Sequence, residues 1–460
     1  MQPLFAYLSQ RRAVLCLFLV SLVLHFIRLG QPGEVVFDEV LVGHFSAQYF
    51  SGHYYFDIHP PLTKLIYALM AWLGGMDPSF TFAANGIAYP GNFYLWMRGL
   101  PALAGSVLPV LVYALSREMG VQRLWALVAG WLVLFDSALM VESRFILNDI
   151  LLLTYGVTGW WAFAIWRRTH KWPWLLAAGL GFGMALSVKW TGLGFIAPAG
   201  VVWLYDFSRK PNARSLGAAL VLIAVPLAIQ LTGFVVHLSL LPQSGTGEAF
   251  MTPAFQKRLI GNQHQDDPMV DALSLPGAIL EVNHAMAQYA GQMATHPYGS
   301  KWYTWPLGWR GIYVWNDDKA TDGRVARIYL FPNVVTWWLA AFGIVYLLIN
   351  LLPRVVAALT GRQHQHIDRV ELVLAMAYLA NLLPFVPIDR VMFLYHYFPA
   401  LIVSVVAAAR LAGGISKPRH LAVGMVLAAG MLFVWQSPII YGLVTDQHGF
   451  DKRMLLPSWV

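Results

Sequence analysis

Long apolar stretches separated by polar segments run through most of the chain. A membrane-spanning helix needs about 20 mostly apolar residues, and a shorter one can suffice inside a bundle. On this basis we predict eleven spans, roughly at 12–28, 95–116, 123–136, 148–166, 173–187, 191–206, 216–238, 332–352, 370–386, 392–410 and 420–437. The apolar runs at 40–50 and 62–73 are too short to span, so we expect helices lying along the membrane surface.

Two of the polar segments are much longer than the others. They cover roughly 29–94 and 239–331, and loops of this length usually carry function. We therefore predict three parts. These are an N-terminal module over 1–238 that includes the first long loop, the second long loop at 239–331, and a C-terminal four-helix module over 332–460.

Composition and charge agree with a polytopic membrane protein. The 460 residues are 58% hydrophobic and 12% charged, about half the charged fraction of an average soluble domain. The net charge is +8, and the basic residues concentrate in alternate short loops, as cytoplasmic loops require. This pattern predicts a cytoplasmic N-terminus and leaves no basic patch for nucleic acid. Cys16 is the only cysteine, so an internal disulfide is excluded.

Two adjacent carboxylates, Asp38 and Glu39, directly follow the first predicted span. Acidic groups beside a membrane are costly to desolvate and therefore suggest a functional site. Asp57 and His59 follow in the same loop, ahead of two prolines. On its own, an acidic pair at this place would more often cap a helix, and two prolines commonly form a rigid turn.

The predicted outer turns contain few cations, and those few are grouped with other polar residues. They are Arg144, Lys189 and Arg390, with His396 close to Arg390 in sequence. Arg144 could instead pair with Glu142, and His396 could be an ordinary core histidine. Because the other short outer turns are almost free of basic residues, we favour a functional role for Lys189 and Arg390.

Eight segments along the chain resemble, in order, those of the protein O-mannosyltransferases. They are Phe37-Asp38-Glu39, Ile58-His59-Pro60-Pro61, Arg98-Gly99, 142–147 (ESRFIL), 187–190 (SVKW), 237–247, 302–306 (WYTWP) and 390–399 (RVMFLYHYFP). Each is weak alone, but their order and predicted outer location are specific. Two residues depart from the family pattern, Asn148 and Glu248. The second long loop is too short for the β-trefoil insertion of fungal and animal members, which indicates a prokaryotic type.

This resemblance implies the C-type glycosyltransferase fold, an all-α polytopic membrane protein with amphipathic helices outside the membrane. Members transfer mannose, with inversion, from a polyprenyl (dolichyl-type) phosphate to Ser or Thr hydroxyls of proteins. The implied partners are the lipid donor, an acceptor protein and membrane lipid, and the chain could dimerise. We expect a bacterial or archaeal plasma (inner) membrane protein with an extracytoplasmic active site.

That chemistry gives each candidate residue an expected role. An alcohol is a weak nucleophile, so a carboxylate must accept its proton; we expect Asp38 to do so. Glu39 is its expected catalytic neighbour, either holding the acceptor backbone or orienting an arginine. Departure of a lipid phosphate needs cations. The phosphate-binding candidates are Lys189, Arg390, Arg144 and His396. The candidates for positioning the acceptor and the loop are His59, Asp57 and Arg98. Arg98 could orient Glu39, or it could equally extend from its helix to the membrane interface. We expect no cofactor and no metal, although the acidic residues and His59 could assemble a divalent-cation site.

Three other functions remain open at this stage. Another C-type enzyme, such as one that transfers aminoarabinose to lipid A, would share the acidic motif, but the segments at 187–190 and 390–399 favour the mannosyltransferases. A transporter or flippase would usually show broken helices in matching halves of a repeat, and no such repeat is evident. An inactive subunit is disfavoured by the intact Asp38 and Glu39.

Overall fold

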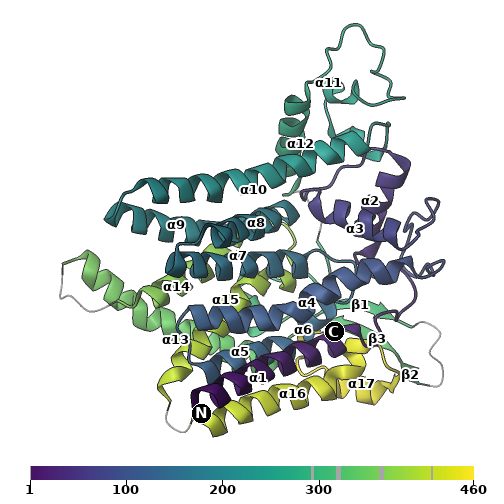
Figure 1. Ribbon diagram of the computed structural model, residues 1–460. Coiled ribbons are helices and arrows are strands. Elements are labelled where there is room, and N and C mark those ends of the chain that lie inside the picture. The colour runs from purple at the N-terminus through teal and green to yellow at the C-terminus, as the bar shows by residue number, and fades with distance from the viewer. Residues whose placement is uncertain (1, 292–294, 318–322, 362–366, 416–417, 460) are drawn as a thin grey trace.

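The computed structural model describes residues 2–291, 295–317, 323–361, 367–415 and 418–459. It is a bundle of long helices that lie side by side, with shorter helices and small strands gathered towards one end (Figure 1). The predicted helical fold class is therefore confirmed.

Each of the eleven predicted spans coincides with a helix. They are α1 (Gln2–Phe26), α4 (Phe93–Glu118), α5 (Arg123–Leu134), α7 (Asp149–Thr169), α8 (Trp172–Val188), α9 (Leu193–Arg209), α10 (Ala213–Leu240), α13 (Val334–Leu359), α14 (Arg369–Leu382), α15 (Phe398–Leu411) and α16 (Pro418–Tyr441). In the described part of the chain, five segments are long and apolar enough to cross a membrane. A multi-pass protein is thus confirmed, while the count of eleven stays a prediction.

Local sequence explains where several of these helices begin. The side chain of Asn212 accepts a hydrogen bond from Ser215 N–H (2.9 Å) at the start of α10, and Asn333 does the same for Val335 (3.1 Å) at α13. Such caps satisfy N–H groups that the helix leaves unpaired. Pro399 lies in the first turn of α15, where its missing N–H is harmless. A 3-10 turn at Leu394–Tyr397 runs directly into α15, so the candidate span Leu394–Gly414 begins close to the predicted start at 392.

The two short apolar runs form the helices α2 (Glu39–Ser51) and α3 (Leu62–Leu73). They contact each other, and α3 also packs against α4, at the right-hand end of the bundle in Figure 1. The other short elements are α6 (Ser137–Glu142), α11 (Pro253–Gln256), α12 (Leu275–Tyr289), α17 (Gln447–Arg453) and the 3-10 turns Trp190–Gly192, Thr246–Phe250, Trp302–Leu307, Leu383–Phe385, Leu394–Tyr397, Ala412–Gly414 and Pro457–Trp459.

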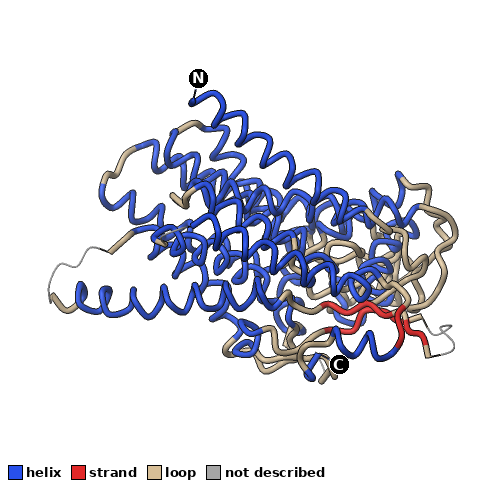
Figure 2. Tube along the Cα trace, turned by 90° about the horizontal axis from the view of Figure 1, so that it is seen from below, coloured by secondary structure: helices blue, strands red, loops and turns tan. Residues whose placement is uncertain are grey.

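The structure contains two small antiparallel sheets that were not predicted from the sequence. Strand β1 (Ile312–Asn316) pairs with β3 (Arg327–Leu330), and β2 (Arg324–Val325) pairs with β4 (Thr445–Asp446). Figure 2 shows the strands together at one end of the molecule. A short apolar and aromatic run does not reveal a strand by its periodicity.

The second long loop docks directly on the first. Tyr54 N–H donates to Gln243 O (2.9 Å). A Cβ added at Gly245 would lie 2.3 Å from Tyr54 O, and one at Gly247 would lie 2.2 Å from Phe56 N. Only glycine permits this approach of the two backbones. The contact holds the segment that leads into Asp57 against the second loop.

Candidate active site

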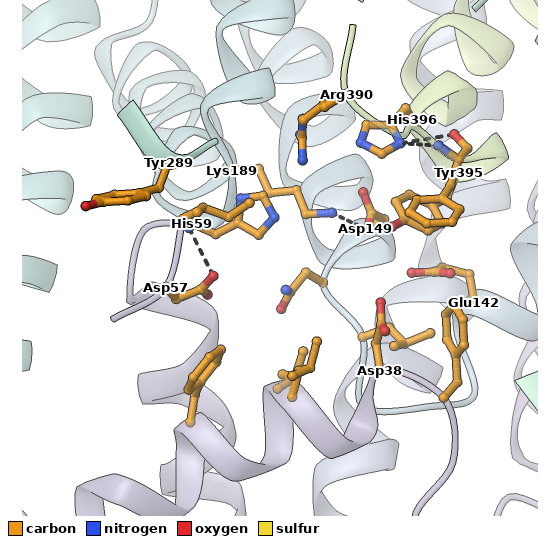
Figure 3. Close-up of a pocket in the computed structure, with 18 of the residues that line it drawn as sticks. Asp38, Asp57, His59, Glu142, Asp149, Lys189, Tyr289, Arg390, Tyr395 and His396 are labelled. Atoms are coloured by element: carbon orange, nitrogen blue, oxygen red, sulfur yellow. Dashed lines mark hydrogen bonds and ion pairs between the residues drawn. The ribbon is translucent and has the colours of Figure 1, made fainter. Parts of the chain in front are cut away.

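A cavity of about 440 Å³ lies where the first long loop meets α6, α7, the turn after α8 and the segment before α15 (Figure 3). Aromatic side chains form much of its wall. Its charged and histidine lining residues are Asp38, Asp57, His59, Glu142, Asp149, Lys189, Arg390 and His396. The structure thus brings together side chains from segments up to about 360 residues apart. Most of the charged and histidine side chains among them are candidates predicted from sequence.

Asp38 precedes α2, and its carboxylate lies beside the cavity with Glu142 and Asp149 (Figure 3). Its side chain caps none of the described N–H groups of that helix. The preceding Phe37 has φ 49°, a conformation that costs a non-glycine residue about 1–3 kcal/mol and often marks a functional site. Burial raises the pKa of Asp38 to about 6, which Lys189 opposes and Asp149 supports.

Glu39 is fully buried and outside the described lining of the cavity. Its two oxygens accept both Nε and Nη2 of Arg98 (2.7 Å each), together with Tyr89 O–H (2.9 Å) and the N–H groups of Val36 and Ile146 (3.1 Å each). These bonds occupy both oxygens fully. Of the two roles considered for Glu39, the contacts agree with orienting an arginine and not with direct contact to a substrate: Glu39 joins α2, α4 and the segment after α6.

Arg98 is the partner that makes this arrangement possible. Its guanidinium also donates to Pro32 O (2.7 Å) and Glu34 O (3.1 Å) in the first long loop. Its side chain is fully buried, as is Glu39. Of the two roles considered for Arg98, the structure shows the one that orients Glu39, because a buried side chain does not reach the membrane interface.

Lys189 and Asp149 form an ion pair in the wall of the cavity. Lys189 ends α8, Asp149 begins α7, and Nζ lies 2.5 Å from Oδ2. The ammonium also lies 5.1 Å from the ring centroid of Tyr395. Asp149 was not among the residues predicted from sequence, since an acidic residue at a helix start can interact favourably with the helix dipole and have no further role.

Arg390 and His396 close the cavity on the side opposite Asp38 (Figure 3). Burial lowers the pKa of Arg390 although Tyr395 acts in the other direction, and the guanidinium stays charged. His396 stacks on Trp305 with ring centroids 5.9 Å apart, and its Nδ1 lies 3.0 Å from Phe393 O. Its ring is thus held in one orientation.

Lys64 supports the part of the first loop that carries Asp57 and His59. Its buried Nζ lies 2.6 Å from Asp57 Oδ2 and donates to His59 O (3.0 Å) and Pro60 O (2.7 Å). Burial favours a higher pKa for Asp57, but Lys64 and His59 hold that pKa below its usual value. Burial lowers the pKa of His59 to about 3, so its imidazole is neutral. Lys64 lies three residues after the segment Ile58-His59-Pro60-Pro61, and only the structure shows its contacts with that segment.

Arg144 is the one predicted phosphate ligand outside the described lining of the cavity. Its guanidinium donates to His25 O (2.8 Å) and Arg28 O (3.0 Å) at the end of α1, and it lies 4.5 Å from the ring centroid of Tyr441. The structure therefore contradicts the predicted role of Arg144. Carbonyl groups that α1 leaves unpaired attract it instead.

Glu142 and Asn148 place unsatisfied acceptors at the cavity. Glu142 Oε2 and Asn148 Oδ1 are buried and have no hydrogen-bond partner among the described residues. Burial, followed by the nearby Asp149 carboxylate, raises the pKa of Glu142 well above its usual value. Buried polar atoms are normally paired, so these two oxygens indicate a polar ligand.

Among the described residues, no group of three His, Cys, Asp or Glu side chains is arranged to hold a metal ion. Asp57 is engaged by Lys64 and Glu39 by Arg98. Neither carboxylate is therefore available to the divalent-cation site considered from the sequence.

The fold is that of known glycosyltransferase structures. The S. cerevisiae protein O-mannosyltransferase Pmt1-Pmt2 complex bound to the sugar donor matches with a TM-score of 0.89 at 19% identity, over 98% of this chain and 93% of that one. ArnT from Cupriavidus metallidurans bound to undecaprenyl phosphate matches with a TM-score of 0.51 at 17% identity, over 92% of this chain and 63% of that one.

Sequence comparison identifies the family. Residues 15–242 match the dolichyl-phosphate-mannose-protein mannosyltransferase family, and residues 277–459 match the C-terminal four-transmembrane region of protein-O-mannosyltransferase. The chain belongs to the protein O-mannosyltransferase family. Dolichyl-phosphate-mannose–protein mannosyltransferase 1 of Candida albicans is 31% identical over 301 residues, which are 61% of this chain and 33% of the relative. The chain thus spans about a third of the length of such curated relatives.

Proposed function

We propose that this protein transfers mannose from a polyprenyl (dolichyl-type) phosphate to a Ser or Thr hydroxyl of a protein, with inversion. One observation carries the proposal. The carboxylate of Asp38, free of any capping bond to the described residues, shares one cavity with the cations Lys189 and Arg390. A base and phosphate-binding cations on either side of a sugar are what such a transfer requires.

In this mechanism Asp38 accepts the proton of the acceptor hydroxyl. The hydroxyl oxygen forms a bond to the anomeric carbon while the bond from that carbon to the phosphate oxygen breaks. The lipid phosphate leaves with the electron pair, and the proton remains on Asp38. A base whose pKa is about 6 is mostly ionised at neutral pH and still has appreciable proton affinity.

Lys189 and Arg390 would stabilise the phosphate as it leaves. Arginine can bind two phosphate oxygens at once, whereas lysine acts as a point charge. The ion pair with Asp149 fixes the position of Lys189 before substrate arrives, and such preorganisation strengthens stabilisation of developing charge. His396 lies beside Arg390 in the same wall.

The unpaired oxygens of Glu142 and Asn148 would form hydrogen bonds with sugar hydroxyls: Asn148 Oδ1 would accept, and the Glu142 carboxyl would donate when it is protonated. They line the same cavity as Asp38 and Asp149, so a sugar placed between the base and the cations would lie within their reach. The acceptor would enter past His59, Phe250 and Tyr289, which come from both long loops.

We further propose a prokaryotic-type member in the plasma membrane, with the N-terminus in the cytoplasm and the cavity on the outer side. The internal segment 239–331 is too short for a β-trefoil insertion, and its described part contains mostly short helices and strands. Both features support the prokaryotic type. In a Cys16→Ser background, cysteines at the exposed Ser79 and Lys171 test the topology. A membrane-impermeant reagent on intact cells should label the first and not the second; equal labelling contradicts the orientation.

The activity test uses purified protein, polyprenyl phosphate mannose and a panel of Ser- and Thr-containing peptides, with products read by mass spectrometry. Addition of one hexose to a Ser or Thr, absent with Asp38→Asn protein, supports the proposal. If no peptide receives mannose, and a sugar from another lipid phosphate is transferred instead, the chain catalyses a different C-type reaction. Cross-linking in membranes tests whether the protein forms a dimer.

A further inference from the structure

A second hollow lies at the opposite end of the bundle from α2 and α3. It surrounds the turn between α9 and α10, at the left in Figure 1. Its volume is about 960 Å³, within the upper part of the roughly 300–1,000 Å³ range of ligand sites. The charged side chains in its wall are Arg167, Arg209, Lys210, Arg214, Arg369 and Asp206.

The charge of this hollow is strongly positive. Asp206 pairs with Arg167 (2.7 Å). Arg209, Lys210 and Arg214 form no ion pair with any carboxylate of the described residues. Three cations facing one hollow repel each other, and an anion in the hollow would remove this repulsion.

An apolar crevice continues from the hollow between α7, α9 and α14. Its volume is about 610 Å³, and it shares Arg167, Tyr205 and Arg369 with the hollow. Beyond these, its wall is mainly apolar and includes Phe163 and Met376. The two spaces together have the polarity of a phospholipid, with a charged end joined to a hydrocarbon part.

We propose that this site binds an anionic phospholipid, with its phosphate against Arg209, Lys210 and Arg214 and an acyl chain in the crevice. Basic pockets between membrane helices bind such headgroups. A soluble anion would make no use of the crevice. On the proposed function, the phosphate of the sugar donor binds beside Lys189 and Arg390 at the opposite end of the bundle, so it is not the occupant of this hollow.

Basic residues on cytoplasmic loops also arise from topology alone, so the test needs a matched control. Arg12 and Arg419 are exposed cations elsewhere on the chain. The double variants Arg209→Gln/Arg214→Gln and Arg12→Gln/Arg419→Gln remove the same charge. The full chain in detergent is titrated with dioleoyl phosphatidylglycerol, dioleoyl phosphatidylcholine or inorganic phosphate, and bound lipid is measured by native mass spectrometry.

Wild type should bind phosphatidylglycerol about tenfold or more tighter than phosphatidylcholine. The Arg209→Gln/Arg214→Gln variant should lose about 25-fold in phosphatidylglycerol affinity, since each of the two cations removed contributes roughly a fivefold factor. The control variant should bind as wild type does. Equal affinity for the two lipids, equal loss in both variants, or displacement of the lipid by an equal concentration of inorganic phosphate would overturn the proposal.

Thermal unfolding without added lipid shows whether each variant is folded. Met376→Trp supplies a second test that changes no charge, because it narrows the crevice. It should weaken phosphatidylglycerol binding, and inorganic phosphate should still fail to displace the bound lipid. Unchanged phosphatidylglycerol binding in this variant would contradict an acyl chain in the crevice. Each of these outcomes is independent of mannose transfer.

Discussion

The ion pairs in and behind the cavity wall are buried, whereas those at the opposite end of the bundle are partly or largely exposed. The side chains of Lys189 and Asp149 are 9% and 10% exposed, and those of Arg98 and Glu39 are 0% exposed. Arg167 and Asp206 at the other end are 40% and 41% exposed. An exposed pair contributes about 0–1 kcal/mol, while a buried pair carries a large desolvation cost.

This difference indicates what each set of charges does. A cation on the cytoplasmic surface helps to set the orientation of the helices in the membrane and stays hydrated. The distribution of basic residues along the sequence predicts such cations directly. A buried pair persists only when other bonds complete its partners, as the backbone bonds of Arg98 and Glu39 do. The buried charges therefore form the framework and wall of the candidate active site.

The largest expected effect comes from Asp38→Asn. Removing a general base typically lowers turnover by about 10²–10⁴-fold. Stability should change little, because the Asp38 side chain caps none of the described N–H groups of α2. Steady-state transfer to a Ser peptide, with donor binding measured in parallel, checks this prediction. Transfer near the wild-type rate would remove Asp38 from the role of base.

Breaking the deepest pair should mainly reduce stability. Arg98→Ala leaves Glu39 as a buried carboxylate without its main partner, a change that typically costs about 3–5 kcal/mol. Thermal unfolding in detergent measures the loss, and Arg167→Ala is the matched exposed control. If the two variants unfold at the same temperature, burial does not distinguish the two ends of the bundle.

Removal of a phosphate-binding cation should have a smaller effect. Lys189→Ala or Arg390→Ala should weaken binding of polyprenyl phosphate by about 10–100-fold, since a hydrogen bond to a charged group contributes roughly 1.5–3 kcal/mol. Arg390→Lys should recover only part of this loss because lysine lacks the bidentate geometry. Direct binding in detergent is the measurement, and wild-type affinity in both alanine variants would contradict these assignments.

The pH dependence follows from the raised pKa of Asp38. Only the ionised carboxylate accepts a proton, so activity should rise with pH through about 6 and be about tenfold lower at pH 5 than at its plateau. Lys189 holds this pKa down, and Lys189→Ala should therefore shift the midpoint upward. A flat profile between pH 5 and 8, or a downward shift in the variant, would argue against Asp38 as the base.

The smallest effect belongs to the exposed pair itself. Arg167→Gln should change the free energy of unfolding by no more than about 1 kcal/mol, and less at high salt because exposed charges are screened. Chemical denaturation in low and high salt compares it with wild type. A loss above about 3 kcal/mol would contradict the prediction that this pair contributes as little to stability as other exposed pairs do.

The helices were largely predictable because an apolar run of spanning length forms an α-helix in a membrane. There the backbone must satisfy its own hydrogen bonds. Errors occurred at ends, as at 332–352, where α13 continues to Leu359. The strands β1 and β3 escaped prediction because their partners lie in another part of the loop.

Sequence by itself determined the helical membrane class, the family resemblance and the candidates Asp38, Lys189 and Arg390, since these depend on residue type and order. Only the tertiary structure decided which charges meet. It turned Glu39 towards Arg98, engaged Arg144 with the end of α1, and brought Asp149 to Lys189. The physical reason is that a buried charge is costly unless it is paired, and burial depends on the tertiary structure and not on sequence position. The pairing in turn determines which charged groups are available to a substrate.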